Sequence, residues 1–382
     1  MKSGNKKILM LLPNGFDPDP RVYKEAKTLV SNGYSVLILA WDREAKYPLL
    51  DQIDGIQVKR IPIRSTYGRG TRQLLFLILY WFRAFYVAMK LDFDIIHCHD
   101  FLTLPLGFLI AKLKSKKIIF DAHESYSEML GENIFGVLKK LIYLLENIII
   151  KRIDLLITVG EILESEYQKR GAVKTRVVGN WKAVEDFKIE PELIEAEKNR
   201  IGIPKGHLVI SFLGFLHHDR KIIPLIKAVK QCKDIFLILG GMGAQENDIR
   251  KAIKGCSNII FIGRYKPDKI PLYTNISDII YYVLDSNNPN AKYSAPNKLF
   301  EALAAGKAIL CGDHGEIAKI VREEQCGWIL KPQEEENLNV VLQEISQNGK
   351  VTEFKTRAFQ AGRSKYNWNK AAQTLLQSYR TL

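Results

Sequence analysis

The chain has 382 residues, of which 47% are hydrophobic, and its formal net charge is +14 at pH 7. This length exceeds one ordinary domain, and the apolar content is enough for two well-formed cores. The five cysteines are scattered, odd in number and never at CxxC spacing, which argues against a disulfide framework or a zinc site and suits a reducing cytosol.

The apolar run near the start of the chain is short. Residues 8–12 precede Pro13, and they fit a first buried strand better than the core of a signal peptide. The longest apolar stretch, residues 74–82, stops at Arg83, far short of the roughly 20 residues that span a bilayer. We therefore expect no transmembrane segment and a cytoplasmic protein.

Strand-like apolar runs alternate with helical segments in two series. The first series is residues 7–12, 36–41, 58–63, 94–97, 117–121, 155–159 and 176–178. The second is residues 208–213, 236–239, 258–262, 279–283, 308–311 and 327–330. The alternation predicts an α/β protein whose parallel sheets carry helices on both faces. The charged residues 183–199 have few apolar residues at strand spacing, so we predict a linker there between domains 1–182 and 200–365.

Residues 55–91 combine basic and aromatic side chains without a single acid. The basic residues are Lys59, Arg60, Arg64, Arg69, Arg72, Arg83 and Lys90, and the aromatic ones include Phe76, Tyr80, Trp81, Phe82, Phe85 and Tyr86. Such a segment suits peripheral docking on an anionic membrane surface, here the inner face of the cell membrane. The alternative is an all-round apolar helix that is simply buried between the sheet and solvent. No nucleic-acid reader motif contains these residues, so we expect no nucleic-acid partner.

Polar loops follow the strands of the first series, where the ligands of doubly wound sheets bind. After the first strand, Gly15 can let the backbone approach a phosphate, and Arg21 opens the next helix. Asp17 and Asp19 form a DxD pair like a metal site, but two carboxylates in a proline-bracketed turn more often cap a helix or face water. We therefore favour a non-metal role for this turn.

Histidines end two strands of the first series. Alternation places His97 and His99 on one face, as in the HxHxDH ligand set of dinuclear metallohydrolases, but Phe101 stands at the position of the last histidine. His123, with Glu124 beside it, can donate to an oxygen that gains charge as a bond breaks, whereas an ordinary core histidine is the alternative. We favour the functional role for His123 and no metal site.

The second series centres on residues 293–311. Ser294 or Ala295 is expected to cap a helix with Pro296 in its first turn, and Gly306 is expected to end it before a strand. The helix start can hold a phosphate, with Lys298 adding a donor. Glu301 lies one turn further on, where a carboxylate can accept the hydroxyls of a ribose. On spacing alone, a capped surface helix with a polar pair is an equal alternative.

The motif PNKLFE at residues 296–301, followed by AAGK at 304–307, is similar to the donor-site signature of family-4 retaining glycosyltransferases of GT-B fold. The stretch from Val178 to Phe187 resembles the hinge between the two domains of that family. The position of the family's second glutamate is Tyr293 here, and Phe215 stands where a cation usually follows the glycine of the phosphate loop.

The resemblance implies two Rossmann-like doubly wound domains that face each other across a cleft, with residues 366–382 forming a helix that returns to the first domain. It implies transfer of a sugar from a nucleoside diphosphate sugar to a glycan or lipid-linked acceptor in cell-surface polysaccharide or glycoconjugate synthesis, with no metal required. The implied donor-binding residues are Gly15, Gly214, Arg264, Ser294, Asn297, Glu301 and Gly315. The implied catalytic residues are His123, Arg220 and Lys298, and the acceptor-side candidates are Asp17, Arg21, His99 and Glu124.

Two other functions are compatible with this sequence. A sugar-nucleotide epimerase of GT-B fold would share the donor site and would form its product without an acceptor. A non-catalytic relative would bind a sugar nucleotide or a partner transferase, which fits the departures at Tyr293 and Phe215.

Overall fold

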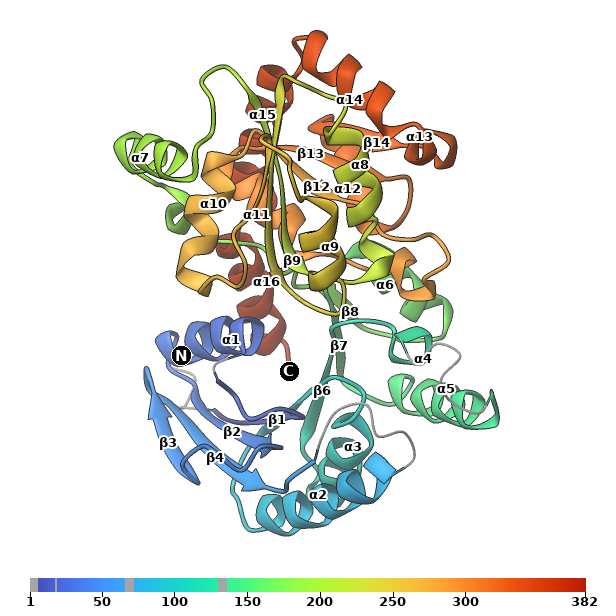
Figure 1. The fold of residues 1–382 in the computed structure, drawn as a ribbon. Helices are drawn as coiled ribbons and strands as arrows, with labels where there is room; N and C mark the ends of the chain where they lie inside the picture. Colours follow the sequence, from blue (N-terminus) through green and yellow to red (C-terminus); the bar gives the residue numbers. More distant parts are fainter. Residues whose placement is uncertain (1–5, 18, 66–71, 130–135) are drawn as a thin grey trace. The chain divides into compact units, whose positions relative to one another are not determined.

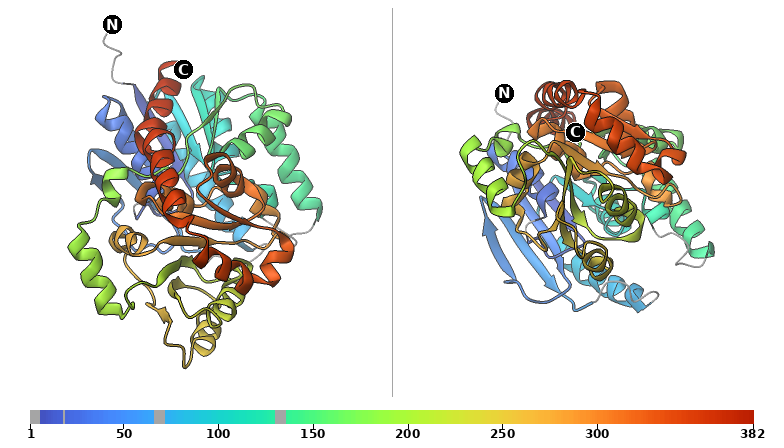
Figure 2. Two further views of the ribbon diagram at one scale, coloured as in Figure 1. Left: turned by 90° about the horizontal axis from the view of Figure 1, so that it is seen from above. Right: turned by 45° about the horizontal axis from the view of Figure 1, so that its top comes forward.

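The structure is a computed structural model that describes residues 6–17, 19–65, 72–129 and 136–382. The chain divides into two compact units. The first unit is Met1–Gly179 together with Ala372–Leu382, and the second is Asn180–Ala371. In each unit a central sheet has helices on both of its faces (Figures 1 and 2).

The first unit contains an eight-stranded sheet with the order β3-β4-β2-β1-β5-β6-β7-β8. Its strands are β1 (Lys7–Leu12), β2 (Ser35–Asp42), β3 (Leu50–Ile53), β4 (Ile56–Pro62), β5 (Ile95–His99), β6 (Lys117–Ala122), β7 (Leu155–Thr158) and β8 (Thr175–Val177). All neighbours pair in parallel except β3, which pairs antiparallel with β4 at the edge. The strand order reverses between β1 and β5, which makes the loops after these strands the expected place for a ligand.

Seven helices, counted over the described residues, belong wholly or partly to this unit. They are α1 (Pro20–Ser31), α2 (Arg72–Met89), α3 (Leu104–Lys114), α4 (Tyr126–Met129), α5 (Gly136–Ile150), α6 (Glu161–Lys169) and the second part of α16 (Trp368–Arg380). The start of α1 is fixed by local chemistry, because the Asp19 carboxylate accepts from the amides of Arg21 and Val22 while Pro20 takes the first position. Arg21 is thereby held at the carboxyl end of β1.

The second unit contains a six-stranded parallel sheet with the order β11-β10-β9-β12-β13-β14. Its strands are β9 (Leu208–Phe215), β10 (Ile235–Met242), β11 (Ile259–Phe261), β12 (Ile279–Tyr282), β13 (Ala308–Gly312) and β14 (Gly327–Leu330). Numbered within the unit, the order is 3-2-1-4-5-6, the arrangement of a dinucleotide-binding fold. Its reversal point lies between β9 and β12.

The helices of the second unit connect these strands and cover the sheet. They are α7 (Pro191–Ile201), α8 (Ile222–Val229), α9 (Glu246–Ala252), α10 (Ile270–Ile276), α11 (Asn297–Ala305), α12 (Gly315–Glu324), α13 (Pro332–Glu336), α14 (Leu338–Gln347), α15 (Val351–Ser364) and the start of α16. Short 3₁₀ turns are η1 (Val184–Phe187), η2 (His218–Arg220), η3 (Pro267–Lys269) and η4 (Pro289–Lys292).

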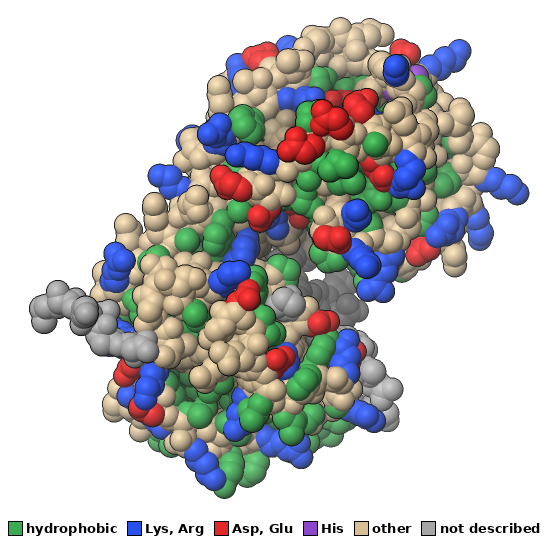
Figure 3. All heavy atoms as spheres, turned by 90° about the vertical axis from the view of Figure 1, so that its left-hand side faces the viewer, with side chains coloured by type: hydrophobic (Ala, Val, Ile, Leu, Met, Phe, Trp, Pro, Cys, Tyr) green, Lys and Arg blue, Asp and Glu red, His purple; other side chains and the backbone are tan. Residues whose placement is uncertain are grey.

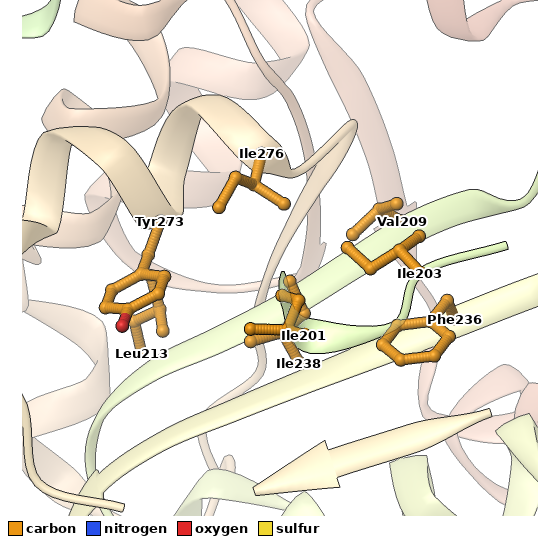
Figure 4. Close-up of a cluster of buried hydrophobic side chains, with 8 residues drawn as sticks. All are labelled: Ile201, Ile203, Val209, Leu213, Phe236, Ile238, Tyr273 and Ile276. Atoms are coloured by element: carbon orange, nitrogen blue, oxygen red, sulfur yellow. The ribbon is translucent and has the colours of Figure 1, made fainter. Parts of the chain in front are cut away.

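One buried cluster shows how the unit is assembled (Figure 4). Its side chains come from α7 and the residue pair after it, β9, β10 and α10, and they are Ile201, Ile203, Val209, Leu213, Phe236, Ile238, Tyr273 and Ile276. Burial of each large apolar side chain contributes about 1.5–3 kcal/mol. The end of α7 is therefore part of the core of the second unit.

The predicted α/β class with two doubly wound parallel sheets is confirmed. Every predicted strand is present with both ends within two residues of the prediction, except that β10 continues three residues further, to Met242. Two features were not foreseen, and one local expectation is wrong. The sequence did not indicate edge strand β3, whose side chains are exposed or half-buried and carry no apolar face. Residues 183–199, the predicted linker, contain η1 and most of α7. Helix α11 begins at Asn297 with Pro296 at its N-cap, so neither Ser294 nor Ala295 caps it.

Candidate functional site

The loops at the carboxyl ends of β9 and β12 meet at the reversal point of the second sheet. Arg220 lies in η2 after β9, and its guanidinium donates to the hydroxyl of Tyr282, the last residue of β12. Its Nε also lies 3.4 Å from a carboxylate oxygen of Asp219. Tyr282 is hydrogen-bonded to Ser294 as well, so one tyrosine connects the β9 loop to the segment before α11.

Glycines allow this edge of the sheet to pack closely. A Cβ on Gly241, whose φ is +139°, would lie 1.7 Å from the carbonyl oxygen of Gly214, and one on Gly243 would lie 2.2 Å from that of Leu216. A side chain at either position would push the β9 loop away. Gly241 and Gly243 therefore allow close packing against the end of β9, which contains Gly214, and against the loop after it.

Helix α11 brings three predicted donor-site residues together. The Lys298 ammonium lies 2.6 Å from Glu301 Oε2, and both side chains are largely buried, with 14% and 5% exposed. Asn297 is exposed at the first position, and its Oδ1 accepts a hydrogen bond of 2.8 Å from the Lys182 ammonium. Gly306, with a φ of +62°, ends the helix as predicted.

Lys298 also faces the β9 loop. A Cβ built on Gly214 would lie 3.8 Å from Lys298 Cε, so the lysine stem passes directly over this glycine. By contrast, Phe215 is 58% exposed and its ring stacks on His217. Arg220 and Lys298 thus both place positive charge on this side of the reversal point.

Two further donor-side predictions lie on neighbouring loops. Gly315 opens α12 with a φ of +72°, and a Cβ there would lie 2.4 Å from the carbonyl oxygen of Ala291, so only glycine fits. Arg264 is exposed and follows Gly263, whose carbonyl oxygen accepts from the Gly241 amide at 2.9 Å. Both residues therefore border the loops described above.

In the first unit, Asp121 at the end of β6 joins three of the predicted residues. Its carboxylate accepts from Arg21 at 2.6 and 2.9 Å, and it pairs with His99 Nδ1 at 3.1 Å and His123 Nε2 at 2.9 Å. Arg21, His99 and Asp121 are buried, whereas the His123 side chain is 21% exposed. Arg21 and His99 are thus out of reach of a ligand and position their neighbours, while His123 can contact one.

The carboxylates around His123 favour its charged form. Although burial lowers the pKa of His123, Asp100 and Asp121 raise it to about 10. Burial likewise opposes the charge on Asp121, but Arg21 and His123 hold the pKa of that carboxyl well below its usual range. His123 is therefore a cation at neutral pH and can donate a proton or a hydrogen bond.

The sequence did not indicate Glu25 and Tyr379, which complete this network. One ligand atom from each of Glu25, His97, His99 and Asp121 lies within 4.8 Å of the others, a spacing that a metal ion can bridge. However, Arg21 lies 3.2 Å from Glu25 and 2.6 Å from Asp121, and the Asp121 oxygens already accept hydrogen bonds. His97 Nδ1 pairs with the Tyr379 hydroxyl at 2.7 Å. Arg21 thus balances the negative charge of these carboxylates in a network of ion pairs. The sequence pattern that could have indicated Glu25 is its i,i+4 spacing from Arg21.

A cavity of about 290 Å³ lies after β1 and β2 in the same unit. Its lining residues are Asn14, Gly15, Phe16, Asp17, Asp19, Asp42, Arg43, Glu44, Lys46 and Tyr47. Gly15 faces the Tyr47 ring, since a Cβ there would lie 3.0 Å from it, and Asp17 is hydrogen-bonded to Tyr47. Glu124 is half-buried beside His123 and does not line the cavity. Pro18, within the predicted loop, lies outside the described residues.

Two families match the chain. Residues 21–181 match the family described as Glycosyltransferase Family 4, and residues 193–365 match the family described as Glycosyl transferases group 1. Together the two matches cover both units. The chain therefore belongs to the family-4 glycosyltransferases of GT-B fold and is a nucleotide-sugar-dependent transferase.

Individual relatives agree with this assignment. An uncharacterized glycosyltransferase of Methanocaldococcus jannaschii is 21% identical over 93% of this chain and 92% of its own length. A phosphatidyl-myo-inositol mannosyltransferase of Mycobacterium tuberculosis is 21% identical over 76% of this chain and 74% of its own. A lipopolysaccharide 1,2-N-acetylglucosaminetransferase of Salmonella typhimurium is 24% identical over 57% and 60%.

Solved structures share the fold. Sucrose-phosphate synthase from Thermosynechococcus elongatus has a TM-score of 0.77 at 15% identity, covering 98% of each chain. Anabaena HepE in complex with UDP has a TM-score of 0.74 at 16% identity, covering 98% of this chain and 100% of that one. At such identities the likeness shows the GT-B fold.

Proposed function

We propose that the protein is a retaining glycosyltransferase that moves a sugar from a nucleoside diphosphate sugar to a glycan or lipid-linked acceptor in cell-surface polysaccharide or glycoconjugate synthesis. The observation that carries the proposal is the grouping of Arg220, Lys298 and Glu301 around the reversal point between β9 and β12. Two cations and a carboxylate at this place suit a diphosphate and a ribose.

The proposed chemistry depends on charge that leaves with the diphosphate. Arg220 can hold phosphate oxygens with two parallel N–H groups, and Lys298 beside Gly214 replaces the cation that Phe215 does not supply. The first amides of α12, after Gly315, add donors. These groups are held by the fold before the reaction, which is the arrangement that stabilises developing charge. No protein nucleophile or metal is needed if the leaving phosphate oxygen takes the acceptor proton.

The acceptor is assigned to the first unit. The cavity between the loops after β1 and β2 is lined by the exposed Asp17 and the Tyr47 ring, which suit the hydroxyls and the apolar face of a sugar. His123 is assigned to the donor sugar, where its positive charge can stabilise a developing negative charge.

The assignment of the acceptor as lipid-linked draws support from one surface of the first unit. We call it the α2–α3–α5 face, because α3 packs against both α2 and α5. More than half of the exposed large hydrophobic residues in the described part of the chain lie on it: Leu74, Leu75, Ile78, Leu79, Phe82, Tyr86, Leu109, Leu113, Val137, Leu141, Tyr143, Leu144, Leu145 and Ile148. Phe82 is 73% exposed, whereas Tyr80 and Ala84 of the same helix are fully buried, so α2 packs on one side and is open to solvent on the other.

The charge of this face favours an anionic membrane. Arg83, Lys112 and Lys140 are exposed on the three helices, and their one acid, Glu146, is buried against Arg170. Along the lower edge of Figure 3, hydrophobic and basic side chains lie next to one another.

Of the other basic residues in 55–91, Arg60 is buried against Asp51 and backbone carbonyls, and Arg69 lies outside the described residues. No helix among the described residues has the length and apolar character needed to cross a bilayer.

Nucleotide binding tests the proposal directly. Thermal shift with a panel of nucleoside diphosphates and their sugars is expected to find one base that stabilises the protein, by about 2.7 kcal/mol at 100 times its Kd. Replacement of Glu301 with Ala should weaken that binding by roughly 1.5–3 kcal/mol, because a charged group loses its hydrogen bonds. Unchanged nucleotide affinity in a folded Glu301→Ala variant would refute the assignment of Glu301 to the ribose hydroxyls.

Product analysis separates the remaining functions. Retained anomeric configuration in the glycoside, read by NMR, is the expected outcome. Conversion of a sugar nucleotide without any acceptor would instead identify an epimerase. Nucleotide-sugar binding without turnover, across a broad set of acceptors, would favour a non-catalytic relative.

Liposome flotation tests the membrane assignment. Binding is expected to require anionic lipid and to weaken as salt rises, because exposed charges are screened over about 10 Å at 0.1 M. Phe82→Ser and Lys140→Glu should reduce it, whereas Leu193→Ser, at an exposed residue of α7, is a matched control. Equal recovery with neutral and anionic vesicles would refute the electrostatic part of the assignment.

A further inference from the structure

Lys182 lies at a junction of three segments of the second unit. It precedes η1, and its backbone is bridged to Asn367, just before α16. Its carbonyl oxygen accepts from the Trp368 amide at 3.0 Å. The following turn is held too, since Asn275 of α10 donates to the carbonyl oxygen of Phe187 at 2.8 Å. The backbone that carries Lys182 is therefore fixed on both sides.

The side chain of Lys182 points to two residues of the donor site. Its ammonium donates to Asn297 Oδ1 at 2.8 Å and lies 3.7 Å from Glu301 Oε1. The side chain is 18% exposed, and burial lowers the pKa of Lys182 although Glu301 opposes that effect. A lysine that is kept from water in this way needs an anionic partner, and Glu301 is the one within reach.

The carboxylate of Glu301 is thus shared by two cations, one for each oxygen. Lys298 lies 2.6 Å from Oε2, and Lys182 lies 3.7 Å from Oε1. Under the proposed function, Lys298 also binds the diphosphate of the donor. If it turns to the diphosphate, Glu301 would remain as a buried carboxylate that depends on Lys182 for its charge balance.

We propose that Lys182 is a positioning residue of the donor site, which holds Asn297 and keeps the Glu301 carboxylate charged and oriented toward the ribose hydroxyls while Lys298 serves the diphosphate. This inference rests on the proposed function. It assigns Lys182 to the ribose end and not to the phosphate end, because its contacts are Asn297 and Glu301. A lysine that only stabilised the fold would not affect which sugar of a nucleotide is preferred.

The test compares UDP with 2′-deoxyuridine diphosphate by isothermal titration calorimetry, with the guanosine and adenosine pairs used where the uridine pair does not bind. The wild-type protein is expected to prefer the ribonucleotide by at least about 10-fold, the value of one hydrogen bond to a charged group. Lys182→Met, which keeps the aliphatic stem, should lower this ratio to about threefold or less. Lys182→Arg should keep a ratio above that of Lys182→Met, and Lys188→Met, at an exposed lysine of the same segment, should leave the ratio unchanged.

The outcomes separate this inference from the proposed function. Absence of binding of any nucleoside diphosphate to the wild-type protein would refute the proposed function itself. A wild-type preference that persists at full size in folded Lys182→Met would overturn only the role of Lys182. Should Lys182→Met fail to fold, Lys182→Gln takes its place, since it retains a donor for Asn297 without the charge, and the same loss of ratio is expected.

Discussion

The two cations near the reversal point of the second sheet give the sharpest test of the reaction. Lys298 is 14% exposed and held by Glu301, and Arg220 is 23% exposed and held by Tyr282. Each is therefore poorly solvated and fixed before a donor binds. Loss of a preorganised donor to developing charge typically costs 10²–10³-fold in rate, so Lys298→Met and Arg220→Met should each lose at least 10²-fold, or about 2.7 kcal/mol.

The double variant decides whether the two cations act on one leaving group. If they do, the combined loss should fall well short of the product of the two single losses, because groups that act as a unit are not additive. The assay is kcat/KM for nucleoside diphosphate release in the transfer reaction, with Arg250→Met as a control, since Arg250 forms an exposed pair with Glu246. Full activity of Lys298→Met with none in Arg220→Met would refute the compensation for Phe215 and point to the backbone amides of residues 294, 295 and 297.

Two further predictions concern the first unit. Arg21→Met should lower the free energy of unfolding by about 3–5 kcal/mol, because it removes the cation 3.2 Å from buried Glu25 and one of the two cations that pair with Asp121, and urea unfolding with a loss under 1 kcal/mol would contradict this. His123 has a folded pKa of about 10, above its ordinary value of 6.5, so its stabilising contribution is complete below pH 6.5 and is lost as the pH rises toward 10. Denaturant titrations across this range should show a decline on the order of a few kcal/mol that His123→Gln removes, and an equal decline in that variant would exclude His123 as its source.

The sequence was sufficient for every strand except β3 and for two neighbouring residues of the candidate donor site. A fully buried parallel strand is a continuous apolar run, so β1 could be located to the residue. Lys298 and Glu301 are three apart on one helix, and a helix fixes such neighbours locally.

Residues that meet only through the tertiary fold could not be located in this way. Tyr379 is 282 positions from His97, and nothing in the local pattern of either residue indicates that they pair. The contacts of Lys182 could likewise not be predicted from the sequence, because they depend on where the fold places Asn297 and Glu301. Arg60 was misjudged for a related reason, since a basic residue in a basic segment gives no sign that it is buried against backbone carbonyls of the β1 loop.

The division of the chain has a consequence for its synthesis. The second unit is continuous in sequence, whereas the first requires residues from both ends of the chain. On the ribosome, Tyr379 emerges after the whole second unit, so until then His97 Nδ1 lacks its hydroxyl partner and Tyr34 lacks its edge-on ring contact. The second unit can therefore mature during translation, but the first unit, although made earlier, reaches its final state last. The second unit should thus complete its folding before the first unit, although most of the first unit is synthesised earlier.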